Sequence, residues 1–231
     1  MSTTNALGQP VGPPVTVPLP RPRPPRTPLT SRYCSVVPVD VATHHAALFD
    51  AFAKDADARN WTYLPYGPFG STADLRDWME RTCTGDDPLF HTILDGEGVP
   101  SGLASFLRID PGNGVIEIGH IHLSPRLQGT AASTEMQALM MGRVFDELGY
   151  RRYEWKCDAL NAPSRRAAER LGFTYEGTFR QATVYKGRNR DTAWFSILDT
   201  EWPERKARFT RWLDRSNFDA NGRQKTPLQG G

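Results

Sequence analysis

Cysteine is scarce in this chain, and its placement fits neither a metal site nor a disulfide framework. Only Cys34, Cys83 and Cys157 occur among 231 residues, without a CxxC pair and without histidine at a metal-ligand spacing. This argues against a zinc ribbon and against a disulfide-stapled secreted domain, and it is typical of reduced cytosolic thiols. We therefore expect no metal.

Long hydrophobic runs and an excess of one charge are also missing. No apolar stretch approaches the ~20 residues that span a bilayer, and no basic segment followed by an apolar one begins the chain. The 28 Lys and Arg residues are mixed with 26 Asp and Glu residues, so the net charge of +2 gives no field that would attract nucleic acid. We expect a soluble, cytoplasmic protein that binds neither membrane nor nucleic acid.

Proline gathers at the N-terminus and divides the chain. Residues 1–30 are rich in proline and contain three arginines but no acidic residue. Proline continues neither a helix nor a central strand, so this segment should be an extended arm that lies on its own domain or on a partner subunit. Docking to a proline-reading module is the alternative. Residues 31–215 are expected to form one globular domain, and the polar tail 216–231 is expected to fray.

Hydrophobic periodicity predicts alternating strands and helices through the central domain. The expected strands are Arg32–Pro38, Leu89–Leu94, Leu103–Ile109, Val115–Leu123, Arg152–Cys157, Phe173–Tyr185 and Asp191–Leu198. The expected helices are Val41–Lys54, Thr72–Thr82, a stripe from Thr134 to Leu148 that stops at Gly149, a helix that begins just after Asn161 and is ended by Gly172, and Glu201–Arg215.

The stretch Val115–Leu171 organises the rest, because it combines two strand-helix units around one turn of small residues. That turn runs from Gln128 to Thr134 and has no bulky side chain, so its backbone N–H groups can point at one small volume. A helix N-terminus after such a turn favours an anion, because its N–H groups are free and its dipole is positive. The pattern predicts a phosphate site.

Several ordered pieces of the sequence resemble the GNAT superfamily of acyl-CoA-dependent N-acetyltransferases, and within it the RimJ/RimL-like group of ribosomal-protein-alanine N-acetyltransferase type. The matching pieces are EIG at Glu117–Gly119, Pro125, QGTAASTE at Gln128–Glu135, NAPS at Asn161–Ser164, RLGF at Arg170–Phe173, EG at Glu176–Gly177 and RDTAWFSILDTEW at Arg190–Trp202. The resemblance implies an α/β fold with a mixed sheet of about seven strands flanked by helices. It also implies transfer of an acetyl group from acetyl-CoA to a primary amine by direct attack.

The resemblance also implies which residues hold acetyl-CoA. Two registers of the phosphate motif compete, Arg126-x-x-Gly129-x-Ala131 and Gln128-x-x-Ala131-x-Ser133, and the second fits the spacing to the helix better. Ile121 and Leu123 would offer backbone partners to the pantetheine arm, and Asn161 would hold its amide. The implied cosubstrate-binding residues are Ile121, Leu123, Gln128, Gly129, Thr130, Ala131, Ala132, Ser133, Thr134, Asn161 and Ser164.

Glu117 and Ser164 are the candidate catalytic residues. Glu117 lies eleven residues before Gln128, where many family members carry the glutamate that removes a proton from the amine; an ion pair with an arginine of the neighbouring strand is its structural alternative. His120 and His122 alternate onto the opposite sheet face unless a bulge changes the register, so they are second candidates. Many family members place a thiolate-protonating tyrosine where this chain has Ala168. Ser164 would take that role, unless it simply caps its helix.

The acceptor amine is not readable from the sequence. Trp61, Tyr63, Tyr66 and Phe69 belong to an aromatic loop that helps form the acceptor wall in the family, although they could equally form a satellite core. A protein N-terminus and a small-molecule amine both stay open, and a homodimer is possible. A catalytically silent CoA-binding or scaffolding protein is the alternative function, and a different nucleotide binder is disfavoured because no acidic ribose ligand follows the turn.

Overall fold

An eight-stranded sheet forms the centre of the computed structural model, which describes residues 3–228. In spatial order its strands are β3 (Leu29–Thr30), β4 (Ser35–Pro38), β5 (Leu89–Leu94), β6 (Pro100–Asp110), β7 (Val115–Leu123), β8 (Arg152–Asp158), β10 (Arg188–Leu198) and β9 (Thr174–Tyr185). Neighbouring strands are antiparallel except β7 and β8, which run parallel. The expected mixed α/β fold is confirmed, with one edge strand, β3, that the sequence pattern did not indicate.

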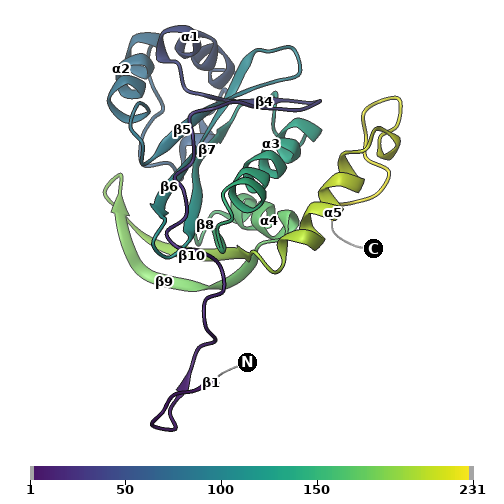
Figure 1. The fold of residues 1–231 in the computed structure, drawn as a ribbon. Coiled ribbons are helices and arrows are strands. Elements are labelled where there is room, and N and C mark those ends of the chain that lie inside the picture. Colours follow the sequence, from purple (N-terminus) through teal and green to yellow (C-terminus); the bar gives the residue numbers. More distant parts are fainter. Residues whose placement is uncertain (1–2, 229–231) are drawn as a thin grey trace.

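Helices cover both faces of this sheet (Figure 1). One face carries α1 (Val41–Phe52) and α2 (Thr72–Thr82), and the other carries α3 (Ala131–Gly142), α4 (Ala162–Leu171) and α5 (Trp202–Leu213). Short helical turns lie at Arg59–Trp61, Arg143–Glu147 and Arg215–Asn217. Two buried clusters result, a large one under α3, α4 and α5 and a smaller aromatic one under α1 and α2.

The caps read from the sequence are present. Ser71 accepts a hydrogen bond from the Asp74 N–H at the start of α2, as expected, and Asn161 accepts one from the Ser164 N–H at the start of α4. The helix expected to run to Leu148 is α-helical only to Gly142 and continues as a π-helical turn, in which the Leu148 N–H donates to the Arg143 carbonyl.

The N-terminal arm lies on its own domain from Arg21 to Thr30. Arg21 donates from Nε to the Leu148 carbonyl at 2.9 Å, and Arg26 donates to the Thr84 carbonyl at 2.8 Å. Gly149 permits this contact, because a Cβ atom there would meet the Arg21 guanidinium and the backbone has φ +65°. Farther out, β1 (Thr3–Thr4) and β2 (Pro10–Val11) form a small hairpin that projects from the body (Figure 1).

The polar C-terminal segment is folded back over α5, so the expectation that it frays is wrong for residues 216–228. Asn217 is buried and donates from Nδ2 to the Trp212 carbonyl at 2.9 Å, while its Oδ1 accepts from the Thr226 hydroxyl at 2.6 Å. The Trp212 indole N–H donates to Gln224, and Leu228 is buried. One buried asparagine satisfies the backbone of this turn, which composition alone does not reveal. Residues 229–231 lie outside the described part.

Glu135 joins α3 to the turn that leads into β4. Its buried carboxylate accepts hydrogen bonds from the Ser31 hydroxyl at 2.8 Å and from the backbone N–H groups of Tyr33 at 2.6 Å and Cys34 at 2.9 Å. Charge-assisted bonds of this kind are stronger than neutral ones, and removing the acceptor leaves buried N–H groups unpaired.

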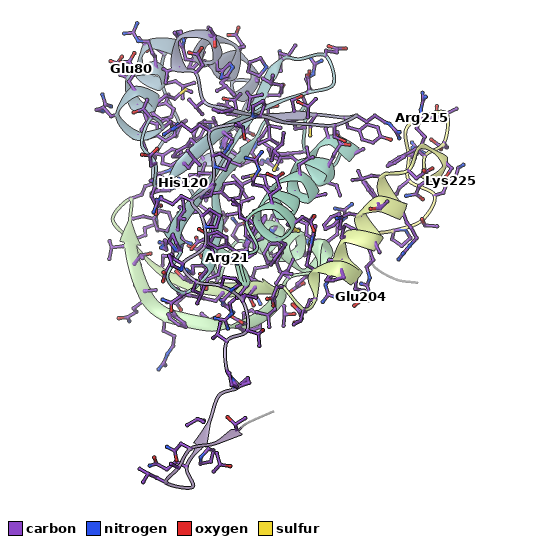
Figure 2. All side chains as sticks on the ribbon, viewed as in Figure 1. Arg21, Glu80, His120, Glu204, Arg215 and Lys225 are labelled. Atoms are coloured by element: carbon purple, nitrogen blue, oxygen red, sulfur yellow. The ribbon has the colours of Figure 1, made fainter. Side chains whose placement is uncertain are left out.

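We expect Glu135→Ala to lower the free energy of unfolding by about 3 kcal/mol, because several bonds to one charged group are lost together. Urea unfolding followed by circular dichroism measures the loss. Glu80→Ala is the matched control: Glu80 is an exposed residue of α2 (Figure 2) and its removal should change stability by less than about 0.5 kcal/mol. Equal losses of unfolding free energy in the two variants would contradict a stabilising role of the hydrogen bonds to Glu135.

Candidate functional site

The two parallel strands at the centre of the sheet separate along their length. β7 and β8 pair only from Val115 with Arg152 to Ile118 with Trp155, and beyond this point each strand continues without the other. The edge of β7 that faces β8 is therefore open over Ile121 and Leu123. An unpaired strand edge beside a groove offers backbone donors and acceptors to an extended ligand.

A β-bulge in β7 lies where the strands separate. On β6, Leu103 and Ser105 are two residues apart, whereas their partners on β7, His122 and Gly119, are three apart. The extra residue gives His120 a φ of +51°, and its ring lies against Tyr66 and Phe90, which belong to the cluster under α1 and α2. The expectation that His120 and His122 face away from Glu117 is therefore wrong, because strict alternation stops at the bulge.

A groove of about 1110 Å³ runs from the N-terminus of α3 along the open edge of β7 to α4. Of the residues implied for acetyl-CoA, all but two line it, namely Ile121, Leu123, Gln128, Gly129, Thr130, Ser133, Thr134, Asn161 and Ser164. Ala131 and Ala132 are the exceptions, and their side chains line a different depression beside Arg126.

The N-terminus of α3 supplies anion-binding groups to this groove. The N–H groups of Gly129, Ala131 and Ala132 have no acceptor among residues 3–228. Arg170 lines the same groove, donates to the Thr134 hydroxyl at 3.1 Å and lies over the Trp212 ring. Helix dipole and guanidinium together favour an anion.

The arrangement of this turn favours one of the two motif registers. Arg126 forms ion pairs with Asp95 and Glu97 away from the groove, so it is engaged elsewhere. Gln128 lines the groove and donates from Nε2 to the Leu123 carbonyl at 2.8 Å, which closes the strand-to-helix turn. The register that begins at Gln128 therefore fits the fold better.

A second pocket of about 470 Å³ joins the groove at Ile121, Trp155, Asn161 and Ser164, which line both. Side chains of β7, β8, β9 and β10 form its walls, and its charged lining residues are Arg108, Glu117, Lys156, Asp158 and Arg190. Aromatic residues on β9 and β10, Phe179 and Trp194, stack on each other at 4.5 Å between ring centroids.

Glu117 is held by two cations in this pocket. Its carboxylate accepts from Arg108 Nη1 at 2.7 and 2.8 Å, and Lys156 Nζ lies 2.7 Å from its Oε2. Lys156 also bridges to Glu154 at 2.8 Å and lies 3.7 Å from the centroid of the Trp194 ring. The ion pair with a neighbouring-strand arginine, kept as the alternative from the sequence, is therefore present.

Two histidines next to the bulge are uncharged at neutral pH. Burial is the main factor that lowers the pKa of His120 to about 4 and that of His122 to about 3. His120 lines the pocket, and its Nδ1 lies 3.1 Å from the Tyr66 hydroxyl. His122 is packed between Trp61 and Phe52, and neither ring nitrogen has a partner among the described residues.

Ser164 lies where the groove and the pocket meet. Its hydroxyl oxygen accepts from the Trp155 indole N–H at 3.0 Å, so its own hydrogen can be donated either to the Cys157 sulfur or to a ligand atom. Burial raises the pKa of the adjacent Cys157 thiol, and a hydrogen bond with Ser164 opposes that rise. Ala168 is buried in the core and offers no polar group.

Of the four aromatic residues of the loop, Trp61, Tyr63, Tyr66 and Phe69, only Tyr63 lines the groove and the pocket. Tyr63 lines both the groove and the pocket and donates to the Leu160 carbonyl at 3.2 Å. Trp61 is buried, while Tyr66 and Phe69 pack against its cluster, in agreement with the satellite-core alternative. Lys186, in the β9–β10 turn, donates to the Trp61 carbonyl at 2.7 Å and so connects that hairpin to the loop.

Sequence reasoning did not single out Lys156, Asp158, Arg170 or Arg190 as site residues. A signal existed for two of them: in RYEWKCD charged residues alternate with aromatic or apolar ones, so one face of β8 is charged. Residues 3–228 contain no cluster of His, Cys, Asp and Glu that could hold a metal ion. Within the same range no helix has the length and apolarity that crossing a membrane requires.

A mixed sheet that opens between two parallel strands, with an anion-binding helix end at one mouth and a charged pocket at the other, is the architecture of an acyltransferase. A family model described as an acetyltransferase (GNAT) domain matches residues 36–174. The chain belongs to this GNAT acetyltransferase family, and the resemblance drawn from the sequence motifs is confirmed.

Solved structures and a curated relative agree. A GCN5-related N-acetyltransferase from Brucella melitensis is 46% identical with a TM-score of 0.90, over 93% of this chain and 97% of that one. A probable GNAT-family acetyltransferase from Chromobacterium violaceum is 39% identical with a TM-score of 0.78, over 84% and 98%. The putative ribosomal N-acetyltransferase YdaF of Bacillus subtilis is 28% identical over 63% of this chain and 80% of the relative, consistent with the RimJ/RimL-like group.

The buried His122 makes stability depend on pH. Its pKa of about 3 in the folded protein lies below the ordinary 6.5, so between these values the unfolded chain binds a proton that the folded chain does not. Unfolding free energy therefore falls as the pH falls.

We expect His122→Phe, which keeps an aromatic ring between Trp61 and Phe52, to reduce this pH dependence. The loss of unfolding free energy between about pH 7 and pH 5.5 should be smaller by about 1 kcal/mol in the variant. Urea titrations at the two pH values measure it. An unchanged difference would show that His122 does not carry the effect.

Proposed function

We propose that this protein transfers an acetyl group from acetyl-CoA to a primary amine, on a protein N-terminus or a small molecule, by direct attack. The observation that carries the proposal is the separation of β7 from β8, which opens a continuous path from the α3 N-terminus past Ser164 into the charged pocket. An acyl carrier in the groove would bring its thioester to the junction, where an amine in the pocket can reach it.

The groove suits a CoA-type molecule at both ends. Phosphates would lie against the free N–H groups at the start of α3 and near Arg170, while the pantetheine arm would extend along Ile121 and Leu123. Asn161 uses its Oδ1 to cap α4, which leaves its Nδ2 free to donate to an amide carbonyl. The fold neighbour MccE, 20% identical with a TM-score of 0.64, was solved with acetyl-CoA and AMP.

The reaction needs the amine nitrogen to bond to the thioester carbon, the carbon–sulfur bond to break, and one proton to leave the nitrogen while the departing thiolate gains one. Ser164 would donate a hydrogen bond to the leaving sulfur, because its oxygen is already fixed by Trp155. N–H groups of the bulge near Ile121 would stabilise the oxyanion.

Of the three candidate proton acceptors on β7, Glu117, His120 and His122, His120 is the best placed, since it lines the pocket and His122 does not. Both oxygens of Glu117 are engaged by Arg108 and Lys156, so Glu117 would act only after one donor is displaced. The His120 imidazole is neutral because its pKa is about 4, and Tyr66 can accept from Nδ1, which leaves Nε2 as the acceptor. Glu117 then holds Lys156 and Arg108 in place.

The proposed activity is tested by thiol release from acetyl-CoA with a panel of primary amines. We expect acetyl-CoA to raise the melting temperature and at least one amine to release thiol. Ser164→Ala should lower kcat about tenfold, because the hydrogen bond to the leaving group is lost, and should lower the free energy of unfolding by about 1 kcal/mol, because the buried Trp155 indole N–H loses its acceptor. Stabilisation by acetyl-CoA without turnover of any amine would favour the catalytically silent CoA-binding protein instead.

A comparison of two variants tests the proton acceptor. His120→Asn should lower kcat by about 10²-fold or more, since asparagine tolerates a positive φ but cannot accept the proton. Glu117→Gln should mainly lower stability, by about 3 kcal/mol, because it leaves the buried Lys156 without its full charge balance. A larger loss of kcat in folded Glu117→Gln than in His120→Asn would reverse the assignment.

A further inference from the structure

Arg190 is a cation in the smaller pocket whose guanidinium has no hydrogen-bond or ion-pair partner among residues 3–228. It lies on β10, is partly buried, and its Nε is shielded from solvent. Its guanidinium forms no hydrogen bond and no ion pair with any residue within 3–228. It lies beside the Tyr185 ring, 6.0 Å from the ring centroid. Keeping a shielded guanidinium donor unpaired costs free energy, so its presence beside a cavity points to a ligand.

The other charges of the pocket do not satisfy Arg190. Arg108 and Lys156 share Glu117, and Lys156 also has Glu154. Asp158 is an acidic neighbour on the adjacent strand, but its two oxygens accept from the Leu160 N–H and the Tyr185 hydroxyl, each at 2.8 Å. The pocket thus holds a guanidinium that no carboxylate of residues 3–228 pairs with directly, since the oxygens of Asp158, the nearest acidic lining residue by strand position, are bonded to neutral donors.

An acyl carrier such as a CoA thioester would not supply an anionic partner for Arg190. Arg190 lines only the 470 Å³ pocket, whereas the helix end and Arg170, which suit phosphates, lie in the other groove. The part of a CoA thioester that would reach the pocket is uncharged. A second donor supports a ligand rich in acceptor atoms, because the Trp194 indole N–H on the same strand is buried, lines the pocket and has no partner in the described chain.

We infer that the acceptor is an amine that also carries an anionic group, a carboxylate or a phosphate, and that Arg190 binds this group. The inference rests on the proposed acetyl transfer and narrows its substrate class. Guanidinium and carboxylate or phosphate form paired, charge-assisted hydrogen bonds, so Arg190 determines specificity without taking part in the chemistry. Polyamines, which bring only positive charge, are poor substrates in this pocket.

Matched amines test the inference. Thiol release is measured with butylamine and 4-aminobutanoate, with ethanolamine and O-phosphoethanolamine, and with the longer ω-amino acids, so that anion type and reach are varied separately. For wild type, kcat/KM for the best anionic amine should exceed that of its neutral counterpart by about tenfold or more. Arg190→Gln should remove this preference and leave kcat/KM for the neutral amines within about twofold, and Arg190→Lys should restore part of it.

Arg188→Gln is the control, because Arg188 is exposed on the same strand and does not line the pocket. It should keep the wild-type preference. Equal rates for anionic and neutral amines, or a preference that survives in Arg190→Gln, would overturn the assignment of Arg190 while acetyl transfer itself stands. If the wild type is stabilised by acetyl-CoA but releases thiol with none of the amines, the proposed acetyl transfer itself is contradicted. The inferred substrate class is then contradicted as well.

Discussion

The site depends on one irregularity, the extra residue in β7. Regular pairing of β7 with β6 would keep strict alternation of side chains, and His120 would then point away from Glu117. The bulge turns His120 toward the α1–α2 layer, and it lies just after the last pairing of β7 with β8. A glycine suits position 119, next to the bulge, because any Cβ atom there would lie only 2.9 Å from the Leu107 side chain. One extra residue in β7 thus brings the His120 side chain into the pocket next to the open edge of the strand.

The groove and the pocket of the site differ in the charges that line them. The larger one presents Arg170 and N–H groups that have no acceptor among residues 3–228, an arrangement that favours an anion. In the smaller one, Arg108 and Lys156 both pair with Glu117, whereas Arg190 has no ion-pair partner within the described chain. Buried ion pairs stabilise a fold weakly but fix the positions of their members. The Glu117 ion-pair cluster therefore holds the side chains that line the smaller pocket in fixed positions.

Segments from both ends of the chain contact the elements that surround the site. The arm contacts the residue after the π-helical turn through Arg21, which donates to the Leu148 carbonyl, and the segment between the arm and β4 is bonded to the Glu135 carboxylate of α3. At the other end, Gln224 and Trp212 are hydrogen-bonded to each other and line the rim of the larger groove. The tail thus contributes to a site more than fifty residues away in sequence from Asn161 and Ser164. Polar composition favours exposure, but one buried asparagine reverses that preference locally.

The sequence by itself determined the order of strands and helices, the turn of small residues before α3, the caps at Ser71 and Asn161, and the family. These features follow from local periodicity and from motifs at fixed spacing, which act over a few residues. Only the tertiary structure decided that His120 faces the pocket, that Glu117 is paired twice and that Trp61 is buried in the core. It also decided that Arg190 has no ion-pair partner among residues 3–228. Each of these depends on strand register and on which side chains meet across the sheet, and a single added residue in β7 changes both.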